Sequence, residues 1–340
     1  MILWAIYKGL PYNSDITSSI CFKVPVVSLD PFETRFHGSF LTQHFSAGFF
    51  FVGTTCNRSA TTGSVDARDN RALSFVLLPL VMTAPLPWLE PHDPFPHPSQ
   101  AWGAHDPAPG LLAAGGALDT QHLLSAYAQG IFPWFSQGQP ILWWSPAPRM
   151  VLVPQEFRLH HALRKTLRQF RAAPGAEIRI DHDFSAVIRA CAHTPRPGQD
   201  GTWIVPRIVQ AYEELHASGY AHSVETWRDG RLVGGLYCVA LGQAVFGESM
   251  FTHAADGSKI ALAALVCLCL RHNVPWIDCQ QNTAHLAFLG GRQIARDTFL
   301  QGIARSSQAP ALDWKFSPLY WDALLQRSCP SPDSAPPSLA

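Results

Sequence analysis

Residues 222–251 read HSVETWRDGRLVGGLYCVALGQAVFGESMF, and their pattern is the strongest indication of the fold. It contains three runs rich in β-branched and aromatic residues, separated by two short turn signals, Asp229-Gly230 and Gly242-Gln243. A two-residue turn of the Asp-Gly type between such runs is typical of a β-hairpin. The stretch therefore predicts three antiparallel strands, over 222–228, 232–241 and 244–251.

The segments on either side add helices and a fourth strand. Pro206 can start an amphipathic helix, and Ser258 can cap an apolar helix over 259–271. A strand over 276–279 and a short helix over 284–289 follow. A meander followed by a helix, a strand and a helix is similar to acetyltransferase-like folds, so we expect an α/β (α+β) protein.

Three polar side chains stand where these strands would normally place apolar ones. Glu248 lies in the third strand, and Asp278 and Gln280 lie in the fourth. Because burying a carboxylate without a partner is costly, a chain that does so twice is expected to form a site. The alternative, two acids with satisfied hydrogen bonds in an ordinary core, stays open at this point.

The N-terminal third differs from the rest. Residues 1–81 have Ser/Thr-rich pieces and no sustained period, which predicts a poorly structured extension before a working protein that starts near Met82. We expect a small aromatic-rich domain over 82–150 and an acetyltransferase-like catalytic domain over 151–322. The Pro/Ser-rich residues 323–340 are expected to be disordered.

The small domain is unusually rich in aromatic residues. After a helix that Asp119 can cap and Gly130 can end, three tryptophans and two phenylalanines lie within thirteen residues. An aromatic plug that closes the domain accounts for Trp143 and Trp144. Trp134 follows a proline in a turn, and we expect it to be half exposed.

The composition narrows the partners and the setting. The 340 residues include 25 basic and 25 acidic side chains, so any contact with nucleic acid requires a local basic patch. The eight cysteines lack a CxxC pair and the fifteen histidines lack an HExxH spacing, so we expect neither a disulfide framework nor a metal site. No apolar run approaches the roughly 18 residues of a membrane span. These features predict a cytoplasmic protein without a membrane partner.

A local basic patch is expected on a predicted helix over 158–171, which contains no acidic residue. Such a run is usually a solvated face, but the absence of acidic partners favours an anionic ligand. The cations in this segment are Arg158, Arg164, Lys165, Arg168 and Arg171.

The connection over 252–258 reads THAADGS and has one glycine. It offers no series of backbone N–H groups that could bind a pyrophosphate, and no basic residue precedes Lys259. Coenzyme A is therefore not expected as the acyl donor, and no other cofactor is expected. A small-molecule N-acyltransferase with a conventional donor and a non-enzymatic RNA-binding or peptide-recognition module remain the alternatives.

Four motifs, in the same order, resemble those of the leucyl/phenylalanyl-tRNA-protein transferase family. They are GIFPWF (130–135) with ILWWSP (141–146), GTWI (201–204), GESMF (247–251) and IDCQ (277–280). The resemblance covers roughly residues 110–300. It implies transfer of leucine or phenylalanine, with methionine as a third candidate, from aminoacyl-tRNA to the α-amino group of proteins that begin with arginine or lysine. That transfer marks the acceptor proteins for degradation by the N-end rule pathway.

The same resemblance implies residue roles. Glu248, Asp278 and Gln280 match catalytic or acceptor-binding positions, and Trp134 and Trp203 match aromatics that hold the terminal adenosine and the substrate. The pocket for the aminoacyl side chain is matched by Leu236, Val245, Leu262, Leu265 and Ile277. Because many relatives carry Phe at the position of Val245, the preference between leucine and phenylalanine stays open. The cations over 158–171, together with Lys259, are expected to contact tRNA phosphates.

Residue chemistry suggests a separate role in the reaction for each of the three polar residues. We expect the Gln280 carbonyl oxygen to accept a hydrogen bond from the attacking amine, while Asp278, on the same strand face, orients it. Glu248 would then match the cationic acceptor. Val245 and Glu248 are three residues apart, so a bulge or kink at Gly247 is needed if both line the site.

Overall fold

The computed structural model describes residues 85–194 and 202–326. The predicted extension over 1–81 and residues 327–340 of the predicted tail lie outside the described residues. Strands and helices are mixed along the described ranges, which confirms the α/β class. The acetyltransferase-like arrangement and the domain boundary at residue 150 stay predictions.

The N-terminal part of the described chain forms a four-stranded sheet in the order β1-β2-β4-β3. Its strands are β1 (Trp88–Leu89), β2 (Leu111–Gly115), β3 (Phe132–Pro133) and β4 (Leu142–Trp144).

Helix α2 (Thr120–Ala128) follows β2 and has the predicted ends. Asp119 accepts a hydrogen bond from a backbone N–H of the first turn at 2.9 Å, and Gly130 follows the helix with a φ of 69°. Trp143 and Trp144 are buried, as expected for a plug, and Trp134 is half-buried against Trp144. The aromatic residues therefore form the core of this part of the chain.

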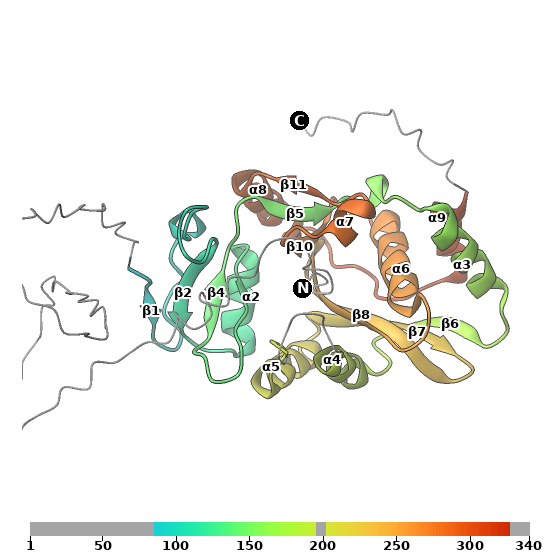
Figure 1. Cartoon of the computed structure of the whole chain (residues 1–340), viewed down its shortest axis with the longest axis horizontal. Coiled ribbons are helices and arrows are strands. Elements are labelled where there is room, and N and C mark those ends of the chain that lie inside the picture. The colour runs from blue at the N-terminus through green and yellow to red at the C-terminus, as the bar shows by residue number, and fades with distance from the viewer. Residues whose placement is uncertain (1–84, 195–201, 327–340) are drawn as a thin grey trace, which may run out of the picture. The chain divides into compact units, whose positions relative to one another are not determined.

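A second sheet has seven strands in the order β11-β5-β10-β9-β8-β7-β6 (Figure 1). Its strands are β5 (Arg149–Leu152), β6 (Ala176–Ile180), β7 (Ala221–Arg228), β8 (Arg231–Leu241), β9 (Ala244–Thr252), β10 (Ile277–Gln280) and β11 (Arg292–Ile294).

The predicted meander is confirmed, because β7, β8 and β9 pair antiparallel in sequence order. In the first turn Asp229 and Gly230 have φ values of 50° and 70°. Positive φ at both positions gives the turn whose twist matches that of a hairpin. Strand β10 instead runs parallel to β9, which requires a crossover connection, here helix α6 (Gly257–Arg271).

Helices cover both faces of the larger sheet. A Cβ on Gly234 would lie 2.5 Å from the Gly257 carbonyl carbon in α6, whereas one on Gly235 would lie 3.5 Å from the Val187 side chain in α4 (Phe184–His193). Neighbouring strand residues point to opposite faces, so α6 and α4 cover opposite faces. Figure 1 shows α5 (Pro206–Ala217) beside α4.

The remaining described helices are shorter or lie later in the chain. They are α3 (His161–Ala172), α7 (Ala284–Phe288), α8 (Arg296–Ser306), α9 (Asp322–Leu325) and the short 3-10 turns η1 (Pro98–Gln100), η2 (Pro154–Glu156) and η3 (Pro318–Trp321). None of these helices, nor any other in the described ranges, combines the length and apolar character that a membrane crossing needs.

Two predicted helix starts are wrong. Helix α6 begins at Gly257, and its N-cap position is Asp256, whose φ of 63° lies in the left-handed region, so Ser258 is not the cap. The Asp256 carboxylate instead accepts hydrogen bonds from Thr166 and Lys259. Helix α3 begins at His161 rather than at 158, because the backbone N–H of Arg158 donates to the carbonyl of Leu289 instead of to a helical partner.

Candidate active site

A β-bulge places Glu248. Tyr237 of β8 pairs with Ser249 and Cys238 pairs with Gly247, so Glu248 is the extra, unpaired residue of β9. The sequence called for a bulge or kink at Gly247 only if Val245 and Glu248 both line the site, and the observed bulge lies next to Gly247, at Glu248. Phe246 and Glu248 both contact Tyr127, whereas Val245 points to the other face, so the bulge does not bring Val245 and Glu248 together.

The Glu248 carboxyl is 1% exposed and is held by two hydrogen bonds to the same oxygen. The Tyr127 hydroxyl donates to Oε1 at 2.8 Å, and Gln280 Nε2 donates to Oε1 at 3.1 Å. Burial raises the pKa of Glu248, while these two hydrogen bonds act in the opposite direction. The Tyr127 hydroxyl is also hydrogen-bonded to the Tyr212 hydroxyl. Burial and the nearby Glu248 raise the pKa of both tyrosines well above 10.0, so both hydroxyls keep their protons.

Gln280 is fully buried at the distorted end of β10. Its φ is 65°, a left-handed conformation that is uncommon for a residue other than glycine, and its backbone N–H donates to Asp278 Oδ1 at 2.9 Å. Its side-chain Oε1 is buried and has no hydrogen-bond partner among the described residues. An unsatisfied buried carbonyl costs about 1–3 kcal/mol, so its presence calls for an explanation.

Asp278 is paired with an arginine that the sequence reasoning missed. Arg149 Nε donates to Asp278 Oδ1 at 2.8 Å and Arg149 NH2 donates to Oδ2 at 2.7 Å, and both side chains are 1% exposed. The third arginine nitrogen donates to the Gly130 carbonyl at 3.1 Å. The available signal was a single cation at the start of the apolar run 149–153.

The hydrogen bonds differ from the predicted division of work. Asp278 was expected to orient the Gln280 side chain, but it holds the Gln280 backbone, and Glu248 holds the side chain. The positive φ at Gln280 is the reason, because it takes this residue out of the strand alternation on which the prediction relied. A role of Glu248 toward the acceptor stays a prediction.

The five predicted pocket residues share one side of the sheet. Leu236 follows Gly234 by two residues on β8 and so faces α6, and the strand register puts Val245 and Ile277 on that same face. Leu262 and Leu265 come from α6 itself. All five are buried, and Leu236, Val245 and Ile277 point toward α6, while the role of the five residues as a pocket stays a prediction.

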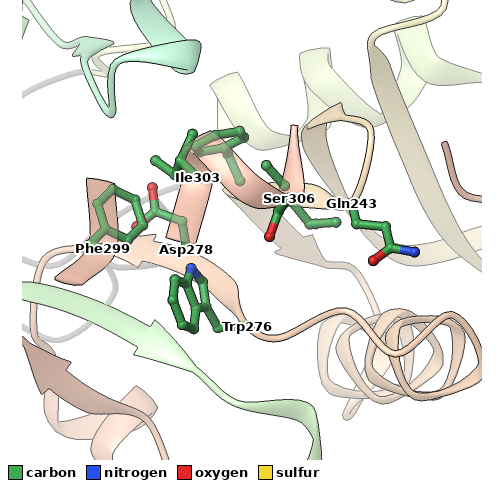
Figure 2. A pocket seen from close by; sticks show the side chains of 9 residues that line it. Gln243, Trp276, Asp278, Phe299, Ile303 and Ser306 are labelled. Atoms are coloured by element: carbon green, nitrogen blue, oxygen red, sulfur yellow. The ribbon is translucent and has the colours of Figure 1, made fainter. Parts of the chain in front are cut away.

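A depression that leaves no room for a water-sized molecule lies at the other end of β9 and β10 (Figure 2). Its lining includes Asp278 and Val245 but none of the predicted leucines. Figure 2 shows Trp276 beside Asp278, with Phe299 and Ile303 of α8 close by. Because Gly302 leaves room for the Trp276 ring, this tryptophan packs directly against the backbone of α8.

The two predicted substrate tryptophans have different environments. Trp134 is half-buried and therefore partly available to a ligand. Trp203 is 2% exposed, and its indole N–H is buried without a hydrogen-bond partner among the described residues. Their contact with a terminal adenosine stays a prediction.

The basic helix is more paired than the sequence indicated. Arg164 is buried and donates to the carbonyls of Leu324 and Leu325, so it anchors α9. Arg171 pairs with Asp322, and Lys259 pairs with Asp256 at 2.7 Å. These acids are distant in sequence from α3, which is why the run seemed to lack partners. Arg158, Lys165 and Arg168 are exposed.

A metal site finds no support in the described ranges, where no three His, Cys, Asp or Glu side chains are grouped as ligands.

Comparison with known proteins gives two family-model matches, one in each sheet-containing part of the chain. Residues 151–304 match the family model of leucyl/phenylalanyl-tRNA protein transferase, and residues 116–147 match the model of the N-terminal domain of that family. The chain is 58% identical over 247 residues to a leucyl/phenylalanyl-tRNA--protein transferase of Polaromonas sp., covering 73% of this chain and 97% of that protein. It is 60% identical over 241 residues to the protein of the same name from Albidiferax ferrireducens, covering 71% and 95%. For the Burkholderia pseudomallei protein of that name the identity is 58% over 231 residues, covering 68% and 91%.

Proposed function

The chain belongs to the leucyl/phenylalanyl-tRNA protein transferase family, and we propose that it moves leucine or phenylalanine from aminoacyl-tRNA to the N-terminal α-amino group of proteins that begin with arginine or lysine. Methionine is a third donor to test. In this proposal the reaction takes place in the cytoplasm, needs no coenzyme A or metal, and marks the acceptor for degradation by the N-end rule pathway.

The single observation that carries the chemistry is the unpartnered Oε1 of Gln280. Glu248 Oε1 accepts from the Tyr127 hydroxyl and from the Nε2 end of the Gln280 amide. The carbonyl end then points away with a free lone pair. A buried acceptor of this kind is suited to hold one N–H of an attacking amine.

The reaction needs orientation more than it needs a base. The aminoacyl ester is already activated, and an α-amino group with a pKa of about 7.7–8.0 is partly neutral near pH 7. Holding the amine beside the ester can lower the activation free energy by on the order of 7–11 kcal/mol. The nitrogen forms the new amide bond, the ester bond to the ribose breaks, and the proton released from nitrogen ends on the ribose hydroxyl. Gln280 orients the N–H without taking its proton.

The remaining parts fit the two substrates. The layer between the sheet and α6, which Leu236, Val245 and Ile277 face, has the apolar character that a leucine or phenylalanine side chain requires, and it lies on the face of the sheet opposite Glu248. The exposed Arg158, Lys165 and Arg168 are available to tRNA phosphates. Stacking of the terminal adenine on Trp134 would contribute about 1–3 kcal/mol.

The direct test is transfer of labelled leucine, phenylalanine or methionine from charged tRNA to an arginine-initiated peptide. Two matched controls are the same peptide with an initial glutamate and the arginine-initiated peptide with an acetylated amino group. We expect transfer to the free arginine peptide and to neither control. Equal transfer to the glutamate peptide, or no transfer from any charged tRNA, would overturn the proposal.

A further inference from the structure

We propose that Arg149 is a positioning residue for the transfer reaction, because it fixes both supports of the Gln280 amide without reaching a substrate. This inference rests on the proposed function. Arg149 lies at the first position of β5, is 1% exposed and faces Asp278 across the strand pair.

The first support runs through Asp278. The two parallel hydrogen bonds from Arg149 fix the plane of the Asp278 carboxylate, so that Oδ1 faces the backbone N–H of Gln280. That hydrogen bond holds Gln280 in its left-handed conformation, which a non-glycine residue adopts only when its surroundings impose it. The direction of the Gln280 side chain therefore depends on the orientation of the Asp278 carboxylate.

The second support runs through α2. Arg149 NH1 donates to the carbonyl of Gly130, just after α2, and Tyr127 near the end of that helix donates to Glu248. Glu248 in turn accepts a hydrogen bond from Nε2 of the Gln280 carboxamide. One guanidinium therefore links the strand that carries Gln280 to the helix that places its carboxylate partner.

The guanidinium itself has little freedom. It lies over the Phe132 ring at 4.9 Å and the Phe299 ring at 4.5 Å, so β3 and α8 enclose it. All three of its nitrogens are used, two by Asp278 and one by Gly130. This geometry requires a planar fork, which a lysine ammonium cannot reproduce.

The test compares Arg149→Lys with wild type in the peptide-transfer assay. We expect kcat to fall about 100-fold, as for a misplacement of roughly 1 Å, with unchanged KM values for aminoacyl-tRNA and peptide. Phe184→Leu, a core change in α4, is the control for general loosening and should lower thermal stability without this selective loss of kcat. If Arg149→Lys and Phe184→Leu lose kcat equally at equal stability, or if Arg149→Lys keeps full kcat, the proposal is overturned.

A second comparison, built on Arg149→Met, keeps the test decisive if Arg149→Lys does not fold. The double variant Arg149→Met with Asp278→Asn replaces the buried ion pair by neutral groups and leaves an Asn oxygen that can accept from the Gln280 N–H. We expect this double variant to fold and to recover part of the kcat that Arg149→Met loses. If Arg149→Met cannot be made, the reference is Arg149→Met with Asp278→Leu, which lacks the acceptor. We expect the kcat of the Asp278→Asn double variant to be higher than the kcat of that reference. No difference between these pairs would contradict the role of the Asp278 acceptor. Absence of transfer by the wild-type protein would instead count against the proposed function.

Discussion

Replacing Gln280 by glutamate tests how Glu248 and residue 280 are coupled. In the native protein Nε2 of Gln280 lies 3.1 Å from Glu248 Oε1, so Gln280→Glu puts two carboxyl groups at that distance. Two charges there repel by about 5 kcal/mol at an effective dielectric constant of about 20. This energy corresponds to about four powers of ten in proton affinity. The pair of carboxyl groups therefore keeps one proton at pH values well above those at which an ordinary glutamate ionises.

The shared proton has a consequence for activity. While it is bound, the carboxyl at 280 can donate to Glu248 and still present a carbonyl oxygen to the amine, much as Gln280 does. Once it is lost, the two carboxylates repel each other and the site is disrupted. We therefore expect single-turnover transfer by Gln280→Glu to fall as pH rises, opposite to the wild type, whose acceptor amine becomes more neutral.

The assay measures single-turnover leucine transfer to an arginine-initiated peptide between weakly acidic and weakly basic pH. The control is Glu248→Gln with Gln280→Glu, which exchanges donor and acceptor, restores one hydrogen bond and removes the repulsion. It should not show the loss of activity at high pH. A Gln280→Glu profile that rises with pH in parallel with wild type would refute the coupling.

Three further outcomes follow from the geometry. Burial raises the pKa of Glu248 above its ordinary 4.5, so ionisation of this carboxyl destabilises the native state as pH rises. In urea unfolding, Glu248→Gln should therefore be more stable than wild type at pH 8 but not at pH 5. A gain in stability that is independent of pH would contradict this. Gly302→Ala would place a Cβ 2.0 Å from the Trp276 ring and should cost about 1–3 kcal/mol of unfolding free energy, whereas unchanged stability would show that the ring can move freely. Arg164→Met should lower the stability of the protein and leave the salt dependence of tRNA binding unchanged. Arg168→Met should reduce the slope of log affinity against log salt concentration by about 0.9. The reverse pattern would show that Arg164, and not Arg168, contacts tRNA.

The elements that the sequence predicted well are those governed by local rules. The hairpin at Asp229 depends on two residues that accept positive φ, and the start of α2 depends on one capping carboxylate at Asp119. Glu248, Asp278 and Gln280 could be selected because polar residues in apolar strands are unusual wherever the strands pack.

The partners of those residues could not be predicted in the same way. Tyr127 is 121 residues from Glu248 and Arg149 is 129 residues from Asp278, so their pairing depends on how α2 packs against β9 and on the pairing of β5 with β10, which no local pattern encodes. The left-handed φ of Gln280 carried no signal either, because glutamine has no preference for that conformation. The residue that holds the Gln280 side chain was therefore predicted incorrectly, although Asp278 and Glu248 were both identified, and the role of Glu248 toward the acceptor stays a prediction.

The most direct test of the central claim is the single-turnover rate of leucine transfer by Gln280→Met, measured at saturating aminoacyl-tRNA and arginine-initiated peptide. Methionine keeps much of the side-chain volume and removes the Oε1 acceptor. We predict a rate about 10- to 150-fold below wild type, the range for losing a hydrogen bond to a group that becomes charged, with unchanged affinity for aminoacyl-tRNA. A rate equal to that of wild type would show that the amine does not depend on Gln280.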